Sequence, residues 1–346
     1  MSKQQVTNGT SSVLLGSPVL PIVAVLWAVA LLGSGIWFIQ RSPRLSTGAE
    51  HLEPESFAQV KNVPTGIFNY SATTVWTPIR LEVDSLIKAE RQREFRLRYL
   101  EPNQKTASSR RVIQMLLNDE LSWSVSDRPL LDEEYRLSQA RGFKLRQIAV
   151  AIDGIAVAVN PDLDIPGLTL EQLRSIYSSE VTNWQQLGGP NLKIVPLSPK
   201  QSSGAALSFF QQQVLADDPF GWTVKFVSNS TQALSKLTET PGAIYYGSAA
   251  EIVPDCSIKT LPLGYTPKQL VSPAQSQESA SACPKSRHRV NIEALRTRKY
   301  PITRYLYVVV KENGDIDQKA GIAYANLLLT KQGQKAIALA GLVPIR

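Results

Sequence analysis

Histidine is scarce in this chain of 346 residues, which contains only His51 and His288. A serine nucleophile of the triad type needs a histidine base, and neither histidine stands in such a setting. No glycine-rich P-loop or dinucleotide-binding pattern is present either. A zinc site needs four ligands, and the two cysteines have only His288 near them. We therefore expect a protein that is not an enzyme and that holds neither a metal nor a cofactor.

The charge balance lacks an acidic excess, since 37 Lys and Arg residues face 29 Asp and Glu residues and give a formal charge of +8. Such a balance favours anionic partners of any size. No run of Lys and Arg with interleaved aromatic residues is present, as nucleic-acid binders usually show. A nucleic-acid partner would rest on net charge alone, and we do not predict one.

A long uncharged stretch, VLPIVAVLWAVALLGSGIWFI, occupies residues 19–39. About twenty such residues cross the hydrocarbon core of a bilayer as one helix. We predict a cytoplasmic N-terminus over 1–18, a single transmembrane anchor over 19–39 and a linker over 40–62; a cleaved signal peptide is the alternative. Arg41 and Arg44 after the span would, by themselves, keep the following domain inside.

After the linker, strand patterns alternate with helix patterns, which predicts an α/β fold with parallel, doubly wound sheets. The run IAVAIDGIAVAVN is too apolar for a half-exposed strand and predicts one that is buried on both faces. Thr169 and Gln172 form a capping box, and Thr231 is expected to cap a later helix. We expect one long helix from Asp317 to Ala340.

Four of the loops between a strand and a helix carry hydroxyl groups or an acid. They contain Thr73 and Thr74, Ser108 and Ser109, Ser126 and Asp127, and Ser202 and Ser203. Each group alone is typical of a helix cap. Ligands bind beyond the carboxyl ends of strands in doubly wound folds, so four such loops in succession predict an anion site. Asp127 would repel an anion unless the anion carries a proton to donate, as hydrogen phosphate does and sulfate does not.

Several long segments carry a resemblance to a known family. They are FNYSATTVWTPIR, SDRPLLDEEY, RGFKLRQIAVAIDGIAVAVNP, GLTLEQLRSIYSSEVTNWQQLGGP, STQAL, PGAIYYGSA and YPITRYLYVVVKENGDIDQKAGIAYANLLLTKQGQ. The chain resembles, over roughly residues 63–346, the periplasmic phosphate-binding proteins of ABC transporters. The resemblance implies a two-lobed, type II periplasmic-binding-protein fold, here preceded by one transmembrane helix. We expect the first lobe over 63–149 and 251–346 and the second over 150–250.

The resemblance also implies which residues contact a ligand. Carried onto this sequence, the ligand-binding residues are Thr73, Thr74, Ser109, Asp127, Ser203 and Gly204. Asp127 matches the family's ligand-accepting aspartate, but the other three loops match incompletely. Ala72 and Ser71 replace a glycine and its neighbour in the first loop, and Arg110 and Arg111 replace a glycine and a threonine in the second.

The fourth loop departs most from the family pattern. Where the family has an arginine four residues before Ser-Gly-Thr, this sequence has Pro199, followed by Ser203, Gly204 and Ala205. A charge-assisted fork and one hydroxyl are therefore missing. Lys200, Arg110 or Arg111 would add charge, but a lysine lacks the bidentate geometry of arginine.

Cys256 and Cys283 bracket a segment rich in proline and serine. From the residues alone, a disulfide and two unpaired thiols both remain open. Both cysteines fall where the resembled subfamily has them, which implies a Cys256–Cys283 disulfide and an extracytoplasmic domain. This implication opposes the arginines after the span, and we give it more weight.

The sequence thus predicts a single-pass protein of the plasma membrane whose binding domain lies on the periplasmic side. Its expected ligand is a small oxyanion, foremost phosphate, and its expected partners are the permease subunits of an ABC importer. The alternative is a relative that has lost its ligand and acts as an interaction or assembly protein at the membrane.

Overall fold

The structure is a computed structural model, and it describes residues 54–91, 94–102, 108–200, 205–275 and 288–346. Two compact units, Met1–Leu52 and Glu53–Arg346, divide the chain. Outside the described residues lie the expected span over 19–39, Ser203, Gly204 and Cys283. Within the described part of the chain, no helix combines the length and the hydropathy that a membrane crossing requires.

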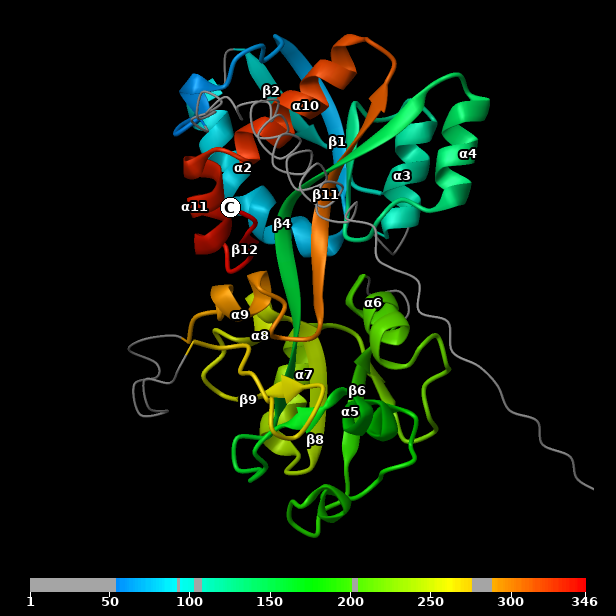
Figure 1. The fold of residues 1–346 in the computed structure, drawn as a ribbon, viewed down its shortest axis with the longest axis vertical. Helices are drawn as coiled ribbons and strands as arrows, with labels where there is room; N and C mark the ends of the chain where they lie inside the picture. The colour runs from blue at the N-terminus through cyan, green and yellow to red at the C-terminus, as the bar shows by residue number, and fades with distance from the viewer. Residues whose placement is uncertain (1–53, 92–93, 103–107, 201–204, 276–287) are drawn as a thin grey trace, which may run out of the picture. The chain divides into compact units, whose positions relative to one another are not determined.

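A mixed sheet organises the second unit (Figure 1). Its strands follow the order β2-β1-β3-β11-β4-β8-β6-β7, and β9 and β12 also pair with β4. The strands are β1 (Gly66–Ala72), β2 (Phe95–Tyr99), β3 (Trp123–Ser126), β4 (Lys144–Val159), β6 (Val195–Pro199), β7 (Lys225–Val227), β8 (Ala243–Ser248), β9 (Lys259–Leu261), β11 (Thr303–Glu312) and β12 (Val343–Pro344). A separate pair joins β5 (Leu168–Thr169) to β10 (Leu263–Gly264).

The long strand β4 links two groups of strands because its two halves have different partners. Lys144–Gly154 pairs with β11, and Ile155–Val159 pairs with β8 and β9. Figure 1 shows β4 and β11 running side by side. Every residue from Val150 to Val159 is buried, so the prediction of a doubly buried strand is confirmed there.

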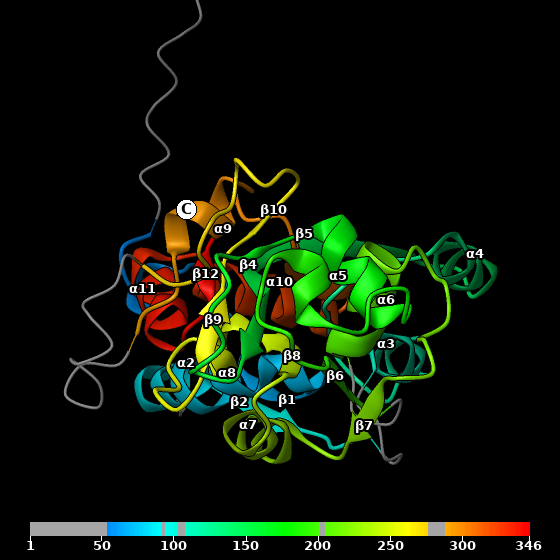
Figure 2. The ribbon, with the colours of Figure 1, turned by 90° about the horizontal axis from the view of Figure 1, so that it is seen from below.

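Helices cover the sheet. They are α2 (Thr77–Arg91), α3 (Ser109–Leu117), α4 (Asp132–Ala140), α5 (Leu170–Tyr177), α6 (Ala205–Val214), α7 (Ser230–Glu239), α8 (Ala249–Ile252), α9 (Ile292–Arg296), α10 (Ile316–Leu328) and α11 (Lys331–Leu339). Short 3-10 turns are η1 (Phe57–Gln59), η2 (Thr74–Trp76) and η3 (Trp184–Leu187). Figure 2 shows α5 and α6 on one side of β6 and β8 and α7 on the other. This arrangement covers both faces, as expected for parallel strands.

Within the large sheet, parallel pairing is confined to the two outer groups, which corrects the expectation of parallel sheets throughout. The strands β2-β1-β3 and β8-β6-β7 are parallel. In contrast, β11 is antiparallel to both β3 and β4, and β4 is antiparallel to β8. The chain therefore passes between the two groups through antiparallel strands. Several loops lie together at one edge of the sheet only where parallel strands end.

Two expected helix boundaries also differ from the structure. The expected helix over Asp317–Ala340 is two helices, because the first ends at Leu328 and Thr330 caps the second by accepting from the N–H of Gly333. Asn229, rather than Thr231, caps α7. The capping box of Thr169 and Gln172 is confirmed.

The buried apolar side chains divide into clusters, two of them large. Leu261, Leu295 and Ile302 belong to the same cluster as the end of β4, whereas Leu306 and Tyr324 pack with β1 and α2. The packing therefore changes between residues 302 and 306 along this part of the chain. The lobe ranges themselves stay a prediction.

Candidate functional site

Three of the predicted loops meet at one edge of the sheet because β2, β1 and β3 are parallel neighbours. The register pairs Ala72 with Val125, so Thr73 and Ser126 leave their strands side by side. The loop after β2 leads to Ser109, the first residue of α3. The three loops thus share the carboxyl end of one parallel group, where ligands bind in such folds.

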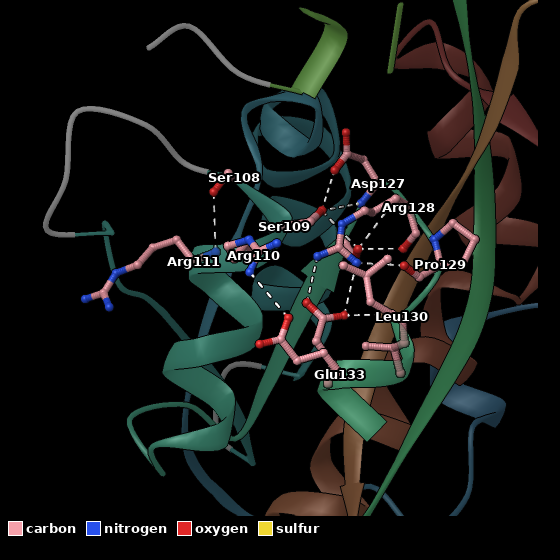
Figure 3. A network of polar contacts seen from close by, with 12 residues as sticks. Ser108, Ser109, Arg110, Arg111, Asp127, Arg128, Pro129, Leu130 and Glu133 are labelled. Carbon is pink, nitrogen blue, oxygen red and sulfur yellow. Dashed lines mark hydrogen bonds and ion pairs between the residues drawn. The ribbon is translucent and has the colours of Figure 1, made fainter. Parts of the chain in front are cut away.

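Asp127 is bound to Ser109, and both side chains are buried. The Ser109 hydroxyl donates to Asp127 Oδ1, and the Asp127 backbone N–H donates back to Ser109 Oγ at 3.1 Å. Ser126 Oγ lies 2.9 Å from the same oxygen. Figure 3 shows the Ser109 and Asp127 side chains turned toward one another. Because a hydroxyl has one hydrogen, Ser109 uses it on Asp127 in this arrangement.

The two threonines of the first loop differ in their exposure to solvent. Thr73 is 1% exposed, and its hydroxyl is buried without a hydrogen-bond partner among the residues that the structure describes. Thr74 is exposed and opens η2. A buried polar group without a partner is rare and calls for an explanation. Of the two threonines, Thr73 is therefore the one whose hydroxyl is left without a partner among the described residues.

Arg304 of β11 brings a guanidinium group to Asp127, and the sequence analysis did not predict it. Its Nη1 donates to Asp127 Oδ2 at 2.6 Å. Its Nε and Nη2 donate to Asp153 Oδ2 of β4 at 3.0 and 2.8 Å. Arg304 and Asp153 are directly opposite in the β11–β4 pair. The arginine therefore bridges two buried carboxylates.

Asp153 has a second donor on its other oxygen. The hydroxyl of Ser248, at the end of β8, donates to Asp153 Oδ1 at 2.7 Å. Burial raises the pKa of Asp153, while the charge of Arg304 and the bond from Ser248 oppose that rise. Both oxygens of Asp153 are thus occupied, as a buried carboxylate requires.

The Asp127 loop is braced by its neighbour Arg128. The Arg128 guanidinium forms a two-pronged ion pair with Glu134 of α4, at 2.7 and 3.0 Å. Its backbone N–H donates to Ser126 Oγ at 3.2 Å, and that hydroxyl donates to the Arg128 carbonyl at 2.6 Å. These contacts fix the backbone on either side of Asp127.

The fourth loop contributes little among its described residues. Pro199 ends β6 and is buried. Proline has no backbone N–H and no polar side chain, so it offers an anion no donor. Ser203 and Gly204 fall outside the described residues, and their predicted role stays a prediction.

The cations suggested as substitutes for the missing arginine lie away from Asp127. Arg110 is turned toward Glu133 of α4 at 3.7 Å, and its side chain is 71% exposed. Arg111 extends away from Asp127 (Figure 3). Lys200 is exposed. None of the three contacts the Asp127 carboxylate in the described part of the site.

Residues 62–332 match the family model of the PBP superfamily domain. The chain belongs to this superfamily. The match covers most of the second compact unit, including Ser109, Asp127, Asp153, Ser248 and Arg304. The two-lobed periplasmic-binding-protein-like fold inferred from the resemblance is thereby confirmed, with a mixed sheet rather than parallel sheets.

Relatives of this superfamily member include bacterial phosphate-binding proteins. The phosphate-binding protein PstS of Staphylococcus epidermidis is 24% identical over 227 residues, which is 64% of this chain and 64% of that protein. The PstS of Bacillus subtilis is 32% identical over 97 residues, or 28% of this chain and 32% of that protein. The chain thus spans less than two thirds of the length of these relatives.

Among solved structures, the ABC-type phosphate transport receptor of Vibrio cholerae is similar in fold. The TM-score is 0.60 at 18% identity, and the similarity covers 81% of this chain and all of that one. At this identity the likeness shows the fold alone. The contacts of the site therefore have to be derived from this chain's own residues.

A signal for the missed residues was present in the sequence. Asp153 is the one charged residue inside the apolar run IAVAIDGIAVAVN. A carboxylate in a strand buried on both faces needs a cationic partner. Arg304, in the apolar strand pattern around YLYVVV, is such a cation. The pattern indicates that a partner exists, although it does not say where the two strands meet.

Proposed function

We propose that this protein is a substrate-binding protein for inorganic phosphate that serves an ABC-type importer, and that it is not an enzyme. The ligand contacts would be Thr73, Ser109, Asp127, Ser203 and Gly204, with the exposed Thr74 as a weaker contact. The observation that carries the proposal is the placement of Asp127, a buried carboxylate set among hydroxyl groups where three parallel strands end. The PstS relatives are named for binding the same ligand.

A carboxylate at this position selects a particular kind of anion. An ionised carboxylate only accepts hydrogen bonds, so it suits an oxyanion that still carries a proton. Thr73 adds a buried donor that has no partner in the described part of the chain. The backbone N–H groups at the start of α3 add a partial positive charge. These features together favour hydrogen phosphate over sulfate.

We further propose that residues 19–39 anchor the chain in the plasma membrane with the binding domain on the outer side. The uncharged stretch supports the anchor. Cys256 is not a free thiol, which supports an oxidising compartment for the domain. The pairing of Cys256 with Cys283 remains part of this proposal, since Cys283 lies outside the described residues.

Calorimetry of the full-length chain in a non-ionic detergent tests the ligand. We expect phosphate to bind and sulfate to bind at least roughly 100-fold more weakly, because sulfate has no hydrogen for Asp127 to accept. Asp127→Asn should weaken phosphate binding and reduce the ratio of phosphate affinity to sulfate affinity. Asp162→Asn, at an exposed position of a loop, is the matched control and should change neither affinity.

A second candidate function is an interaction or assembly role without a ligand. It is favoured by buried Pro199, which stands where an arginine would supply a fork of donors. Native protein that binds neither phosphate nor sulfate while remaining folded would replace the first proposal with this one.

A further inference from the structure

The buried guanidinium of Arg304 lies at the proposed phosphate site. Its side chain is 3% exposed, and Nη1 is 2.6 Å from Asp127 Oδ2. An oxyanion that donates its proton to Asp127 has an oxygen within about 3 Å of that carboxylate. The same oxyanion therefore lies within a few ångströms of the guanidinium.

Arg304 also lies beside α6, the helix that follows the fourth loop in the sequence. The Arg304 guanidinium carbon lies 5.4 Å from the ring centroid of Phe209. Phe209 belongs to α6, the helix that follows the fourth loop and contacts η2 of the first loop. The guanidinium thus contacts Asp127 and also lies near α6, whose preceding strand ends at Pro199.

We propose that Arg304 determines the oxyanion specificity of this site, by supplying from β11 the guanidinium charge that the fourth loop lacks at Pro199 and by holding Asp127 as a hydrogen-bond acceptor. The inference rests on the proposed function. Arg304, which lies 177 positions from Asp127 in the sequence, would thus take the role of an arginine in the fourth loop.

The charges around Arg304 explain why its removal should weaken phosphate binding. Asp127 and Asp153 are both within hydrogen-bond distance of one guanidinium, so the buried group carries one net negative charge. Glu251 of α8 adds a further electrostatic interaction with Arg304. A phosphate dianion entering such a group is repelled by the carboxylates. The nearby guanidinium offsets this repulsion, and the fork geometry of arginine suits both partners.

The experiment measures phosphate and sulfate affinity of the full-length chain in detergent by calorimetry. Replacing Arg304 alone would leave two buried carboxylates without a cation and risks unfolding. We therefore use Arg304→Gln combined with Asp153→Asn, which keeps the native net charge of the group, and Asp153→Asn alone as its background. Circular dichroism and thermal melting confirm that each variant is folded.

Asp153→Asn should bind phosphate more tightly than the native protein, by up to about tenfold, because one repelling charge is gone. The double variant should bind phosphate at least about tenfold more weakly than Asp153→Asn, with a narrower phosphate-to-sulfate ratio. Arg304→Lys with Asp153→Asn keeps the positive charge but not the fork geometry of arginine. Its phosphate affinity should fall between those of Asp153→Asn and the double variant with glutamine. This variant also serves as the test if the glutamine variant does not fold.

Arg110→Gln is the matched control for loss of one positive charge near the site. It should change phosphate affinity by less than about threefold, since Arg110 is exposed and paired with Glu133. An equal loss in Arg110→Gln and the double variant would overturn the inference, as would a double variant that binds like Asp153→Asn. Native protein that binds no phosphate would remove the proposed function and this inference together.

Discussion

The hydroxyl of Tyr324 in α10 donates to the carboxylate of Asp84 in α2 at 2.7 Å, inside a fully buried core. The hydroxyl of Tyr70 in β1 donates to the other oxygen of Asp84. Trp76 of η2 donates its indole N–H to the Tyr324 hydroxyl at 3.2 Å. This polar network ties the first loop, which carries Thr73, to α2 and α10.

The network predicts an unusual dependence of stability on pH. Burial raises the pKa of Asp84 from 3.8 to about 6, although the hydrogen bonds from Tyr70 and Tyr324 oppose the rise. A raised folded-state pKa means that folding favours the protonated acid. The contribution of Asp84 to the free energy of unfolding is therefore fully present below about pH 4 and is lost as the pH rises through 6. The loss should be about 3 kcal/mol, at about 1.4 kcal/mol per pH unit.

Urea unfolding of native protein and Asp84→Asn between pH 4 and pH 7 measures this contribution. The difference in unfolding free energy between the two should change by about 3 kcal/mol across that range, in favour of the native protein at low pH. Glu82→Gln, at an exposed position of the same helix, is the control and should run parallel to the native curve. Parallel curves for Asp84→Asn as well would show that Asp84 does not titrate in this window.

The two threonines of the first loop should behave differently when each is replaced by valine. Thr73→Val removes a buried hydroxyl that has no partner among the described residues, so the unfolding free energy should stay equal or rise. Phosphate affinity should nevertheless fall by roughly tenfold or more, because a donor to a charged ligand is lost. Calorimetry and urea unfolding of the same samples give both quantities.

Thr74→Val is the matched comparison, since Thr74 is exposed. We expect it to change phosphate affinity by less than about threefold. A larger loss of phosphate affinity in Thr74→Val than in Thr73→Val would show that Thr74, and not Thr73, is the main ligand contact of this loop.

Restoring the donors that are missing near the fourth loop should strengthen binding. Pro199→Arg combined with Ala205→Thr adds a guanidinium at the end of β6 and a hydroxyl at the start of α6. Phosphate affinity should rise by roughly tenfold or more, which corresponds to about 1.4 kcal/mol. Pro199→Gln with Ala205→Thr separates the effect of charge from that of the lost proline. A folded arginine variant with no gain would favour the assembly role.

The cysteine pair gives a test of topology. Cys256→Ser with Cys283→Ser should lower the free energy of unfolding by roughly 3 kcal/mol, because a closed loop restricts the unfolded chain. In intact cells, neither cysteine of the native protein should react with a thiol reagent before reduction. Ready labelling of both cysteines would mean that the domain faces the cytoplasm, as the arginines after residue 39 suggest.

The sequence by itself determined the features that depend on neighbouring residues. The apolar run over 150–159 requires a buried strand, and Thr169 with Gln172 caps a helix wherever that helix packs. The hydroxyl groups and Asp127 follow parallel strands, so their meeting at one edge of the sheet follows from strand order. Local periodicity and capping are properties of a few adjacent residues.

Only the tertiary structure decided what surrounds Asp127. The antiparallel insertion of β11 between β3 and β4 places Arg304 opposite Asp153 and beside Asp127. Such pairing depends on the register of strands far apart in the chain and on the burial that the whole sheet gains, which no local pattern encodes. The same holds for the break before Thr330. The sequence predicts one helix over Asp317–Ala340, whereas the chain turns before Thr330 and packs α11 against α2.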